Sequence, residues 1–269
     1  MEFSVLQGFE QHNIYRQIVM CKFYYSNLYH MKKFSIKLLI AGNLKFNLNI
    51  SKISKWKSFL FSISEAHHLG IIPNSDGLDW EYTDAKLSEI LIPDPAYDLT
   101  FAIGNFPLEN NFYMRRISNN ITILSLFETG DILRNSDLEI ENFIIRNIYE
   151  IVLVYLKFDK QVPESAYTVA HDEIRGCLFD MNSYKPDIVY STEKVKLCSE
   201  CRIQFEKLTL PHDFMKQLDR ELCKIRKGKF YIIANWIKAN PILSILITTL
   251  SALIIDVLSH YIWELIKCN

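Results

Sequence analysis

Four residues with metal-binding side chains stand in two close pairs, His171 with Cys177 and, after 20 intervening residues, Cys198 with Cys201. One imidazole nitrogen and three thiolates form a set that Zn²⁺ binds tetrahedrally, at roughly 2.0 to 2.3 Å. The CxxC spacing presents two sulfurs to one ion without strain. Because four protein ligands leave no open position for water or substrate, the pattern predicts a structural zinc site.

Two other interpretations of the four residues are a redox-active CxxC pair and unrelated thiols. The redox interpretation is weaker because the pair follows a lysine-rich loop and is accompanied by a distant cysteine and histidine. Zinc at such sites contributes on the order of 10 kcal/mol, so the loss of one ligand is expected to unfold the loop 177–201. The acidic residues Asp172, Glu173 and Asp180 either accept a hydrogen bond from His171 or are solvated loop charges.

The metal segment resembles a known family. Cys177-Leu-Phe-Asp-Met181-Asn182, followed by Cys198-Ser-Glu-Cys201, is similar to the C-terminal half of the archaemetzincin motif, in which a zincin active-site helix leads into a cysteine-rich structural zinc site. By this resemblance His171 stands in place of the first structural cysteine, and Met181 corresponds to the methionine beneath the catalytic metal. The resemblance runs from Tyr97 to about Leu208 and implies a zincin-like fold.

The same resemblance compares residues 121–126 and 141–156 with the family's last strand and active-site helix. Archaemetzincins carry HExxH on that helix, where two histidines bind catalytic zinc and the glutamate activates water. This chain has no HExxH and offers Arg146-Asn147-Ile148-Tyr149-Glu150 instead. Peptidase activity by that mechanism is therefore not implied.

The alternative is that the chain is an enzyme, a membrane-bound metallopeptidase. Its catalytic metal would then lie in an unorthodox second site formed by Glu150 and by His67 or His68. The two adjacent histidines are expected at a polar helix end, where neighbouring side chains point about 100° apart and do not readily chelate one ion. Arg115 and Arg116 could bind an anion, but a surface turn is the better interpretation.

The elements expected to position these residues come from hydrophobic periodicity. Strands are expected at 34–41, 45–50, 87–92, 99–103 and 121–126, with the first two forming a hairpin, and helices at 51–63, 141–156 and 211–227. Strands followed by helices and a late metal segment indicate an α/β or α+β layer structure. We expect α+β, with a mixed sheet, packed helices and a zinc-binding loop.

Residues 242–263 are apolar and long enough, as a helix, to cross a bilayer core of roughly 30 Å. Their Leu, Ile and Val side chains favour insertion by about 5 kcal/mol, against at most about 3 kcal/mol for Asp256. Pro241 suits the first helical position, and Tyr261 and Trp263 suit an interfacial aromatic belt. A buried helix of a soluble core is the alternative.

The division of the chain follows from these segments. We expect an N-terminal extension at residues 1–33, with Met31 as an alternative start, and a zincin-like domain at 34–210 that includes the zinc loop 171–201. An amphipathic basic helix and a connector are expected at 211–240, and a transmembrane anchor at 241–266. Lys224, Arg226, Lys227, Lys229 and Lys238 precede the anchor and only Lys267 follows it. The positive-inside rule then places the main domain in the cytoplasm of a single-pass protein of the cell or inner membrane.

Composition narrows the function classes. The 269 residues carry a formal net charge of -1, which gives no case for nucleic-acid binding. Six cysteines do not form a disulfide framework and suit a reducing cytosol.

The leading hypothesis is a non-catalytic pseudo-metalloprotease domain that acts as a sensor or effector, by analogy with prokaryotic defence effectors that have terminal membrane helices. Its expected partners are the membrane and a protein or a second copy. A pore-forming toxin that uses Asp256 is a further alternative.

Overall fold

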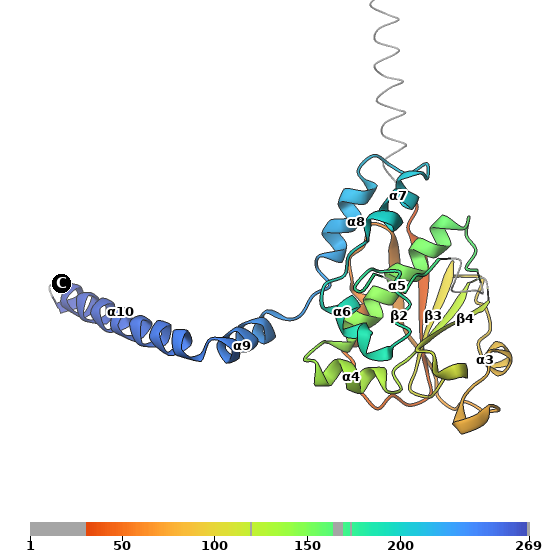
Figure 1. The fold of residues 1–269 in the computed structure, drawn as a ribbon, viewed down its shortest axis with the longest axis horizontal. Coiled ribbons are helices and arrows are strands. Elements are labelled where there is room, and N and C mark those ends of the chain that lie inside the picture. Colours follow the sequence, from red (N-terminus) through yellow and green to blue (C-terminus); the bar gives the residue numbers. More distant parts are fainter. Residues whose placement is uncertain (1–30, 119, 164–168, 173, 268–269) are drawn as a thin grey trace, which may run out of the picture. The chain divides into compact units, whose positions relative to one another are not determined.

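A mixed five-stranded sheet with the order β2-β1-β3-β5-β4 carries the first structural unit (Figure 1). The computed structural model describes residues 31–118, 120–163, 169–172 and 174–267. It divides into a unit that ends at Arg226 and a second unit that starts at Lys227. The expected N-terminal extension, 1–33, lies almost wholly outside the described residues.

The strands are β1 (Phe34–Ala41), β2 (Phe61–Leu69), β3 (Leu99–Gly104), β4 (Met114–Ser118) and β5 (Ile121–Ser125). β1 pairs in parallel with β2 and β3, β3 pairs in parallel with β5, and β4 is antiparallel to β5. Every residue of β3 is buried, as expected of a central strand covered on both faces. The predicted α+β class is confirmed.

Helices cover the sheet unequally. In the first unit they are α2 (Ile50–Ser54), α3 (Asp84–Ile90), α4 (Thr129–Asn135), α5 (Ile140–Lys157), α6 (Ile188–Glu193), α7 (Ser199–Glu206) and α8 (Phe214–Leu222). Figure 1 shows α5 lying across the strands. Its apolar side chains join Phe101 and Ile103 of β3 in the main core, and Leu87 of α3 packs with Ala102 on the other face. Burial on nearly all sides explains why α5 is so apolar.

The hydrophobic periodicity of the sequence predicts most of the core strands and helices correctly. The predictions for 34–41, 99–103, 121–126 and 141–156 are confirmed to within one or two residues. The predicted helix 211–227 is confirmed only over Phe214–Leu222.

Three predicted elements are wrong, each for a local reason. Residues 45–49 form no strand, and Phe46 packs closely on Gly130 of α4. The helix expected over 51–63 ends at Ser54, and the alternation of buried and exposed residues from Phe61 belongs to β2. The strand expected at 87–92 is helix α3, whose N-cap Thr83 accepts a hydrogen bond from the Lys86 amide.

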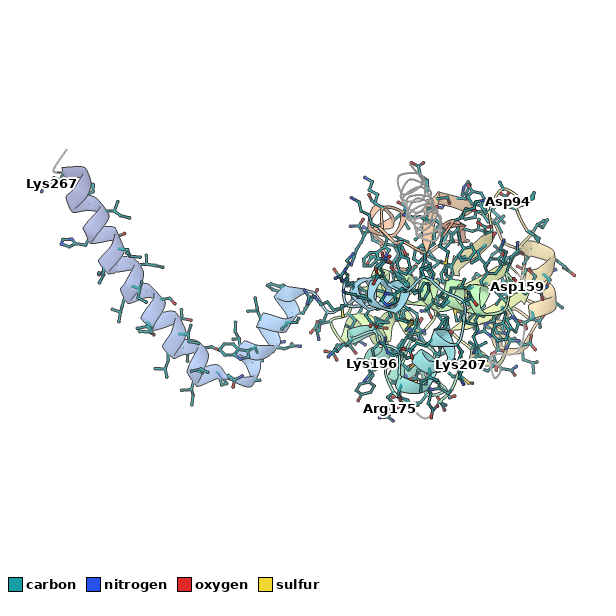
Figure 2. All side chains as sticks on the ribbon, turned by 90° about the horizontal axis from the view of Figure 1, so that it is seen from above. Asp94, Asp159, Arg175, Lys196, Lys207 and Lys267 are labelled. Atoms are coloured by element: carbon teal, nitrogen blue, oxygen red, sulfur yellow. The ribbon has the colours of Figure 1, made fainter. Side chains whose placement is uncertain are left out.

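The second unit consists of α9 (Lys229–Ala239) and α10 (Pro241–Lys267). Among the described residues, α10 is the one helix long and apolar enough to cross a membrane, over Pro241–His260, and none of that span is buried. Figure 2 shows side chains projecting from this helix on all sides. Pro241 opens the helix as predicted, and Asp256 is exposed on it.

The contact between Phe46 and Gly130 predicts that no side chain larger than that of glycine fits at position 130. A Cβ at Gly130 would lie 2.2 Å from the Phe46 ring, which is buried, whereas a Cβ at Gly70 meets nothing within 4 Å. We expect Gly130→Ala to lower the free energy of unfolding by about 1 to 3 kcal/mol and Gly70→Ala to leave it unchanged or slightly raised. Urea unfolding midpoints measure both, and equal midpoints would show that the packing is not tight.

Candidate metal centre

The four predicted ligands come together in the first unit. One ligand atom each from His171, Cys177, Cys198 and Cys201 lies within 4.8 Å of all the others. The Cys177 and Cys201 sulfurs are 3.9 Å apart, and Cys198 Sγ lies 3.6 Å from His171 Nε2. A tetrahedral zinc ion with ordinary bond lengths separates two sulfurs by about 3.8 Å and a sulfur from a nitrogen by about 3.5 Å. The side chains therefore fit the size of zinc.

The start of α7 presents two of the sulfurs. Cys198 is the N-cap of this helix, and its sulfur accepts a hydrogen bond of 3.4 Å from the Cys201 amide. The Cys198 amide donates in turn to the Cys177 sulfur at 3.5 Å. Backbone amides therefore hold the Cys177 and Cys198 sulfurs in place. The local fold thus prepares the sulfurs to act as ligands.

The loop before α7 positions the other two ligands. His171 is held by a short parallel bridge to Asp180, with hydrogen bonds from its amide to the Phe179 carbonyl and from the Met181 amide to its carbonyl. Gly176 precedes Cys177 with φ at +81°, a left-handed conformation that glycine adopts without strain. Its amide donates to the Asp180 carboxylate at 3.1 Å. The turn at Cys177 is therefore fixed by backbone geometry.

The acidic residues near the loop have different environments. Asp180 is buried and accepts from the Gly176 and Asn182 amides, so it stabilises the turn rather than His171. Asp172 is exposed and accepts from the Ser183 amide, and Glu173 lies outside the described residues. His171 Nδ1 is buried and has no hydrogen-bond partner among the described residues. The imidazole of His171 thus has Nε2 beside the Cys198 sulfur and Nδ1 without a hydrogen-bond partner among the described residues.

The thiols influence one another's ionisation. A hydrogen bond from Cys201 lowers the pKa of Cys177 to about 4. The same contact raises the pKa of Cys201, because a second thiolate beside the first is unfavourable. A bound cation removes this conflict, since it stabilises all the thiolates together. The donor set is thus suited to a soft divalent metal, and a zinc ion there would be held by all four side chains.

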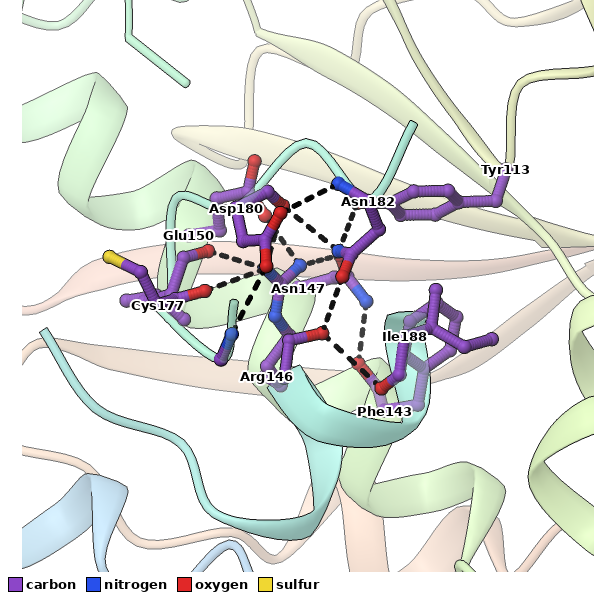
Figure 3. Close-up of polar contacts among 12 residues, drawn as sticks. Tyr113, Phe143, Arg146, Asn147, Glu150, Cys177, Asp180, Asn182 and Ile188 are labelled. Atoms are coloured by element: carbon purple, nitrogen blue, oxygen red, sulfur yellow. Dashed lines mark hydrogen bonds and ion pairs between the residues drawn. The ribbon is translucent and has the colours of Figure 1, made fainter. Parts of the chain in front are cut away.

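The polar residues of α5 form a buried network behind this loop (Figure 3). Arg146 has no exposed surface, and its Nη1 donates to Asn147 Oδ1 at 2.7 Å and to Glu150 Oε2 at 2.6 Å. Its Nη2 donates to the Leu178 carbonyl at 2.5 Å and to the Asp180 carbonyl at 3.3 Å. The guanidinium therefore joins the helix to the backbone of the metal loop.

A second guanidinium completes the pairing of Glu150. Arg116 of β4 lies 3.8 Å from the other carboxylate oxygen of Glu150, and both side chains are nearly fully buried. The segment that resembles the zincin active-site helix thus holds an internal ion-pair network. The signal for the pair was an arginine four residues before a glutamate on an otherwise apolar helix.

The network extends to two further elements. Asn182 donates to the Tyr113 hydroxyl at 3.2 Å, and Ser191 of α6 donates to Asn182 Oδ1 at 3.0 Å. Burial raises the pKa of Tyr113, so its hydroxyl keeps its proton. One set of hydrogen bonds therefore connects α6, the metal loop and the segment before β4.

The residues of the alternative metal site are not brought into one cluster. His67 and His68 are exposed on β2, where adjacent side chains point to opposite faces, so their predicted position at a helix end is wrong. Glu150 is enclosed by its two arginines. Among the described residues, the metal-ligand types gather only at the cluster of His171 and the three cysteines.

The predicted surface turn at Arg115 and Arg116 is also wrong. Both residues lie on β4. Arg115 pairs with Asp84, its Nε donating at 2.8 Å, and Arg116 is buried beside Glu150. Arg115 thus has a carboxylate of its own, whereas Arg116 shares Glu150 with Arg146.

Comparison with known proteins gives one structural likeness. No protein-family model matches the chain, and no curated protein matches it. The chain is similar to the crystal structure of the archaemetzincin from Methanopyrus kandleri, with 11% sequence identity and a TM-score of 0.40, over 65% of this chain and 97% of that chain. This is the family that the metal segment resembles in sequence.

The metal centre predicts an unequal response of two cysteines. We expect Cys201→Ser to abolish stoichiometric zinc binding and to lower the melting temperature by on the order of 10 °C or more, because a site of this kind is worth several kcal/mol. Cys223→Ser is the matched control, since Cys223 is an exposed thiol outside the cluster. Metal analysis and calorimetry measure both, and a full zinc content in Cys201→Ser would contradict the assignment.

The buried ion pair predicts a large effect from one neutralised charge. We expect Glu150→Gln to cost about 3 to 5 kcal/mol, because it leaves Arg146 and Arg116 buried without their counter-ion. Asp131→Asn removes the exposed pair with Lys45 and is expected to cost less than about 1 kcal/mol. Urea unfolding compares them, and a Glu150→Gln effect as small as that of the control would contradict the account of the network.

Proposed function

We propose that the chain is a membrane-anchored, zinc-stabilised and non-catalytic domain that acts as a sensor or effector at the membrane. The observation that carries this proposal is the closed character of the metal centre. Four protein ligands surround one position, and the three sulfurs are buried. Such a centre has no place for a reacting water molecule, so its metal would have a structural role.

The chemistry of the ligands favours zinc. Three thiolates and one imidazole form a soft set, which suits zinc better than magnesium or calcium. The separations between the ligand atoms match those around a tetrahedral zinc ion, and a buried position is typical of structural zinc. The bound ion would fix the loop 171–201 against α7.

The environment of α5 supports a non-catalytic role. Its buried carboxylate, that of Glu150, is paired with Arg146 and Arg116. Catalytic acids and bases need contact with substrate, whereas these groups are buried and bonded to one another. The polar side chains of this helix hold the fold together.

The second unit supports the membrane part of the proposal. The exposed apolar side chains of α10 would be costly in water over a length that matches a bilayer core. Basic residues precede it, including Arg226, Lys227 and Lys238, and these favour a cytoplasmic location for the first unit. Cysteines that form no disulfide bond are also typical of proteins in a reducing compartment.

Zinc counting separates the structural interpretation from the peptidase alternative. We expect one tightly held equivalent of zinc for each chain, which is lost only when the protein unfolds. A second equivalent that exchanges easily with chelator would indicate an open catalytic site and would contradict the proposal.

The membrane anchor predicts a response to charge. We expect the double variant Leu250→Lys and Leu253→Lys to leave the membrane fraction, because two lysines near the centre of the span cost about 5 to 7 kcal/mol and exceed the gain from its apolar residues. Thr249→Leu, a change within the same helix, is the control and should remain in the membrane. Alkaline carbonate extraction measures this, and a double variant that stays in the pellet would count against a spanning α10.

A further inference from the structure

A pocket of about 470 Å³ opens on the first unit, away from the metal ligands. Its walls come from three separate parts of the chain, namely the segment that enters β1, the loop before β2, and α8 with the residues that flank it. The volume lies within the range of about 300 to 1,000 Å³ that is usual for small-molecule sites. The pocket is therefore large enough for a ligand of the size of a mononucleotide.

A buried carboxylate forms the floor of this pocket. Glu221 of α8 is 9% exposed and accepts hydrogen bonds from Ser58 Oγ at 2.7 Å, the Phe59 amide at 2.9 Å and the Tyr149 hydroxyl at 2.6 Å. Burial raises the pKa of Tyr149, so the phenol remains a donor. Three donors satisfy most of the acceptor capacity of Glu221. The carboxylate thus fixes the floor and is not free to bind a cation.

Three lysines surround the opening. Lys33, Lys57 and Lys224 are exposed, and their ammonium groups form no ion pair or hydrogen bond with any residue that the structure describes. Asp213 is the other acidic residue that lines the pocket besides Glu221. The three lysines outnumber the two carboxylates of the lining, Asp213 and Glu221. An excess of positive charge at a concave opening attracts anions.

Part of the wall is apolar and is formed by Met31, Phe59, Pro211 and Phe214. The rings of Phe59 and Phe214 meet edge to face, with centroids 5.4 Å apart and an interplanar angle of 78°. Phe59 and Met31 are half-buried and line the pocket, so part of their surface faces the cavity. Aromatic walls of this kind favour a flat ring in a ligand.

We propose that this pocket binds a small organic anion that carries a flat ring, with the ring against Phe59 and the anionic group at Lys57 and Lys224. The ligand class follows from the three lysines of the lining and from the apolar part of the wall. The pocket would then be the input site of the sensor, a part of the proposal that rests on the function proposed above.

The position of the pocket suits an input site. Tyr149, which holds its floor, lies on α5 one turn from Arg146, whose guanidinium holds the metal loop. Most of one wall belongs to α8, the last helix before the first unit ends at Arg226. A ligand that contacts Lys224 would therefore act close to the connector that leads to the membrane helix.

The test uses adenosine monophosphate as the probe, with adenosine and inorganic phosphate as its two parts. Calorimetric titration of the full zinc-bound chain in detergent should show submillimolar binding of the monophosphate, at least tenfold tighter than either part. The double variant Lys57→Ala and Lys224→Ala should weaken it at least tenfold. Lys216→Ala, an exposed lysine of α8 outside the pocket, should not.

Two results would overturn the proposal, namely no measurable binding of the monophosphate, or equal binding by the double variant and the Lys216→Ala control. Zinc content and melting temperature of each variant, equal to those of the parent chain, show that the fold is intact. The Leu250→Lys and Leu253→Lys variant keeps the two hypotheses apart. If it leaves the membrane and still binds the monophosphate, anchoring and ligand binding are separate properties, and each can fail alone.

Discussion

The burial of the Arg146 guanidinium is the constraint on which much of the first unit depends. A cation with no exposed surface must be matched by charge and by acceptors, or its desolvation would unfold the protein. Glu150 supplies the charge, and carbonyls of the metal loop supply acceptors. The loop must therefore keep one backbone conformation, and a metal ion held by its cysteines would maintain it. The metal centre and the helix behind it are parts of one arrangement.

Helix α5 divides its polar contacts between two regions. Arg146 and Glu150 face the metal loop and β4, whereas Tyr149 reaches the Glu221 carboxylate under the pocket. The remaining faces of the helix pack into the core. A rigid helix with polar contacts at both places can carry a small displacement from one to the other, because neither contact can relax independently in a close-packed interior.

Local pattern in the sequence was sufficient for part of this structure. The metal ligands, β5 and α5 are visible as spacing or periodicity, since their signals lie within a few residues. The parallel pairing of β1 with β2 is not visible in this way, because Phe34 pairs with Phe61, far along the chain. Arg116 looks like a surface residue until Glu150 is placed beside it. The pocket floor was likewise missed, because the donors to Glu221 come from distant segments.

With zinc in the proposed site, the order of elements along the chain would link maturation to metal supply. The last strand, β5, ends at Ser125, and the first metal ligand is His171. During synthesis the sheet can therefore assemble before any ligand has left the ribosome. A cell short of zinc would then accumulate chains with a formed sheet and bare thiols, which are open to oxidation and to proteolysis. Zinc availability would set the amount of mature protein through turnover, after translation is complete.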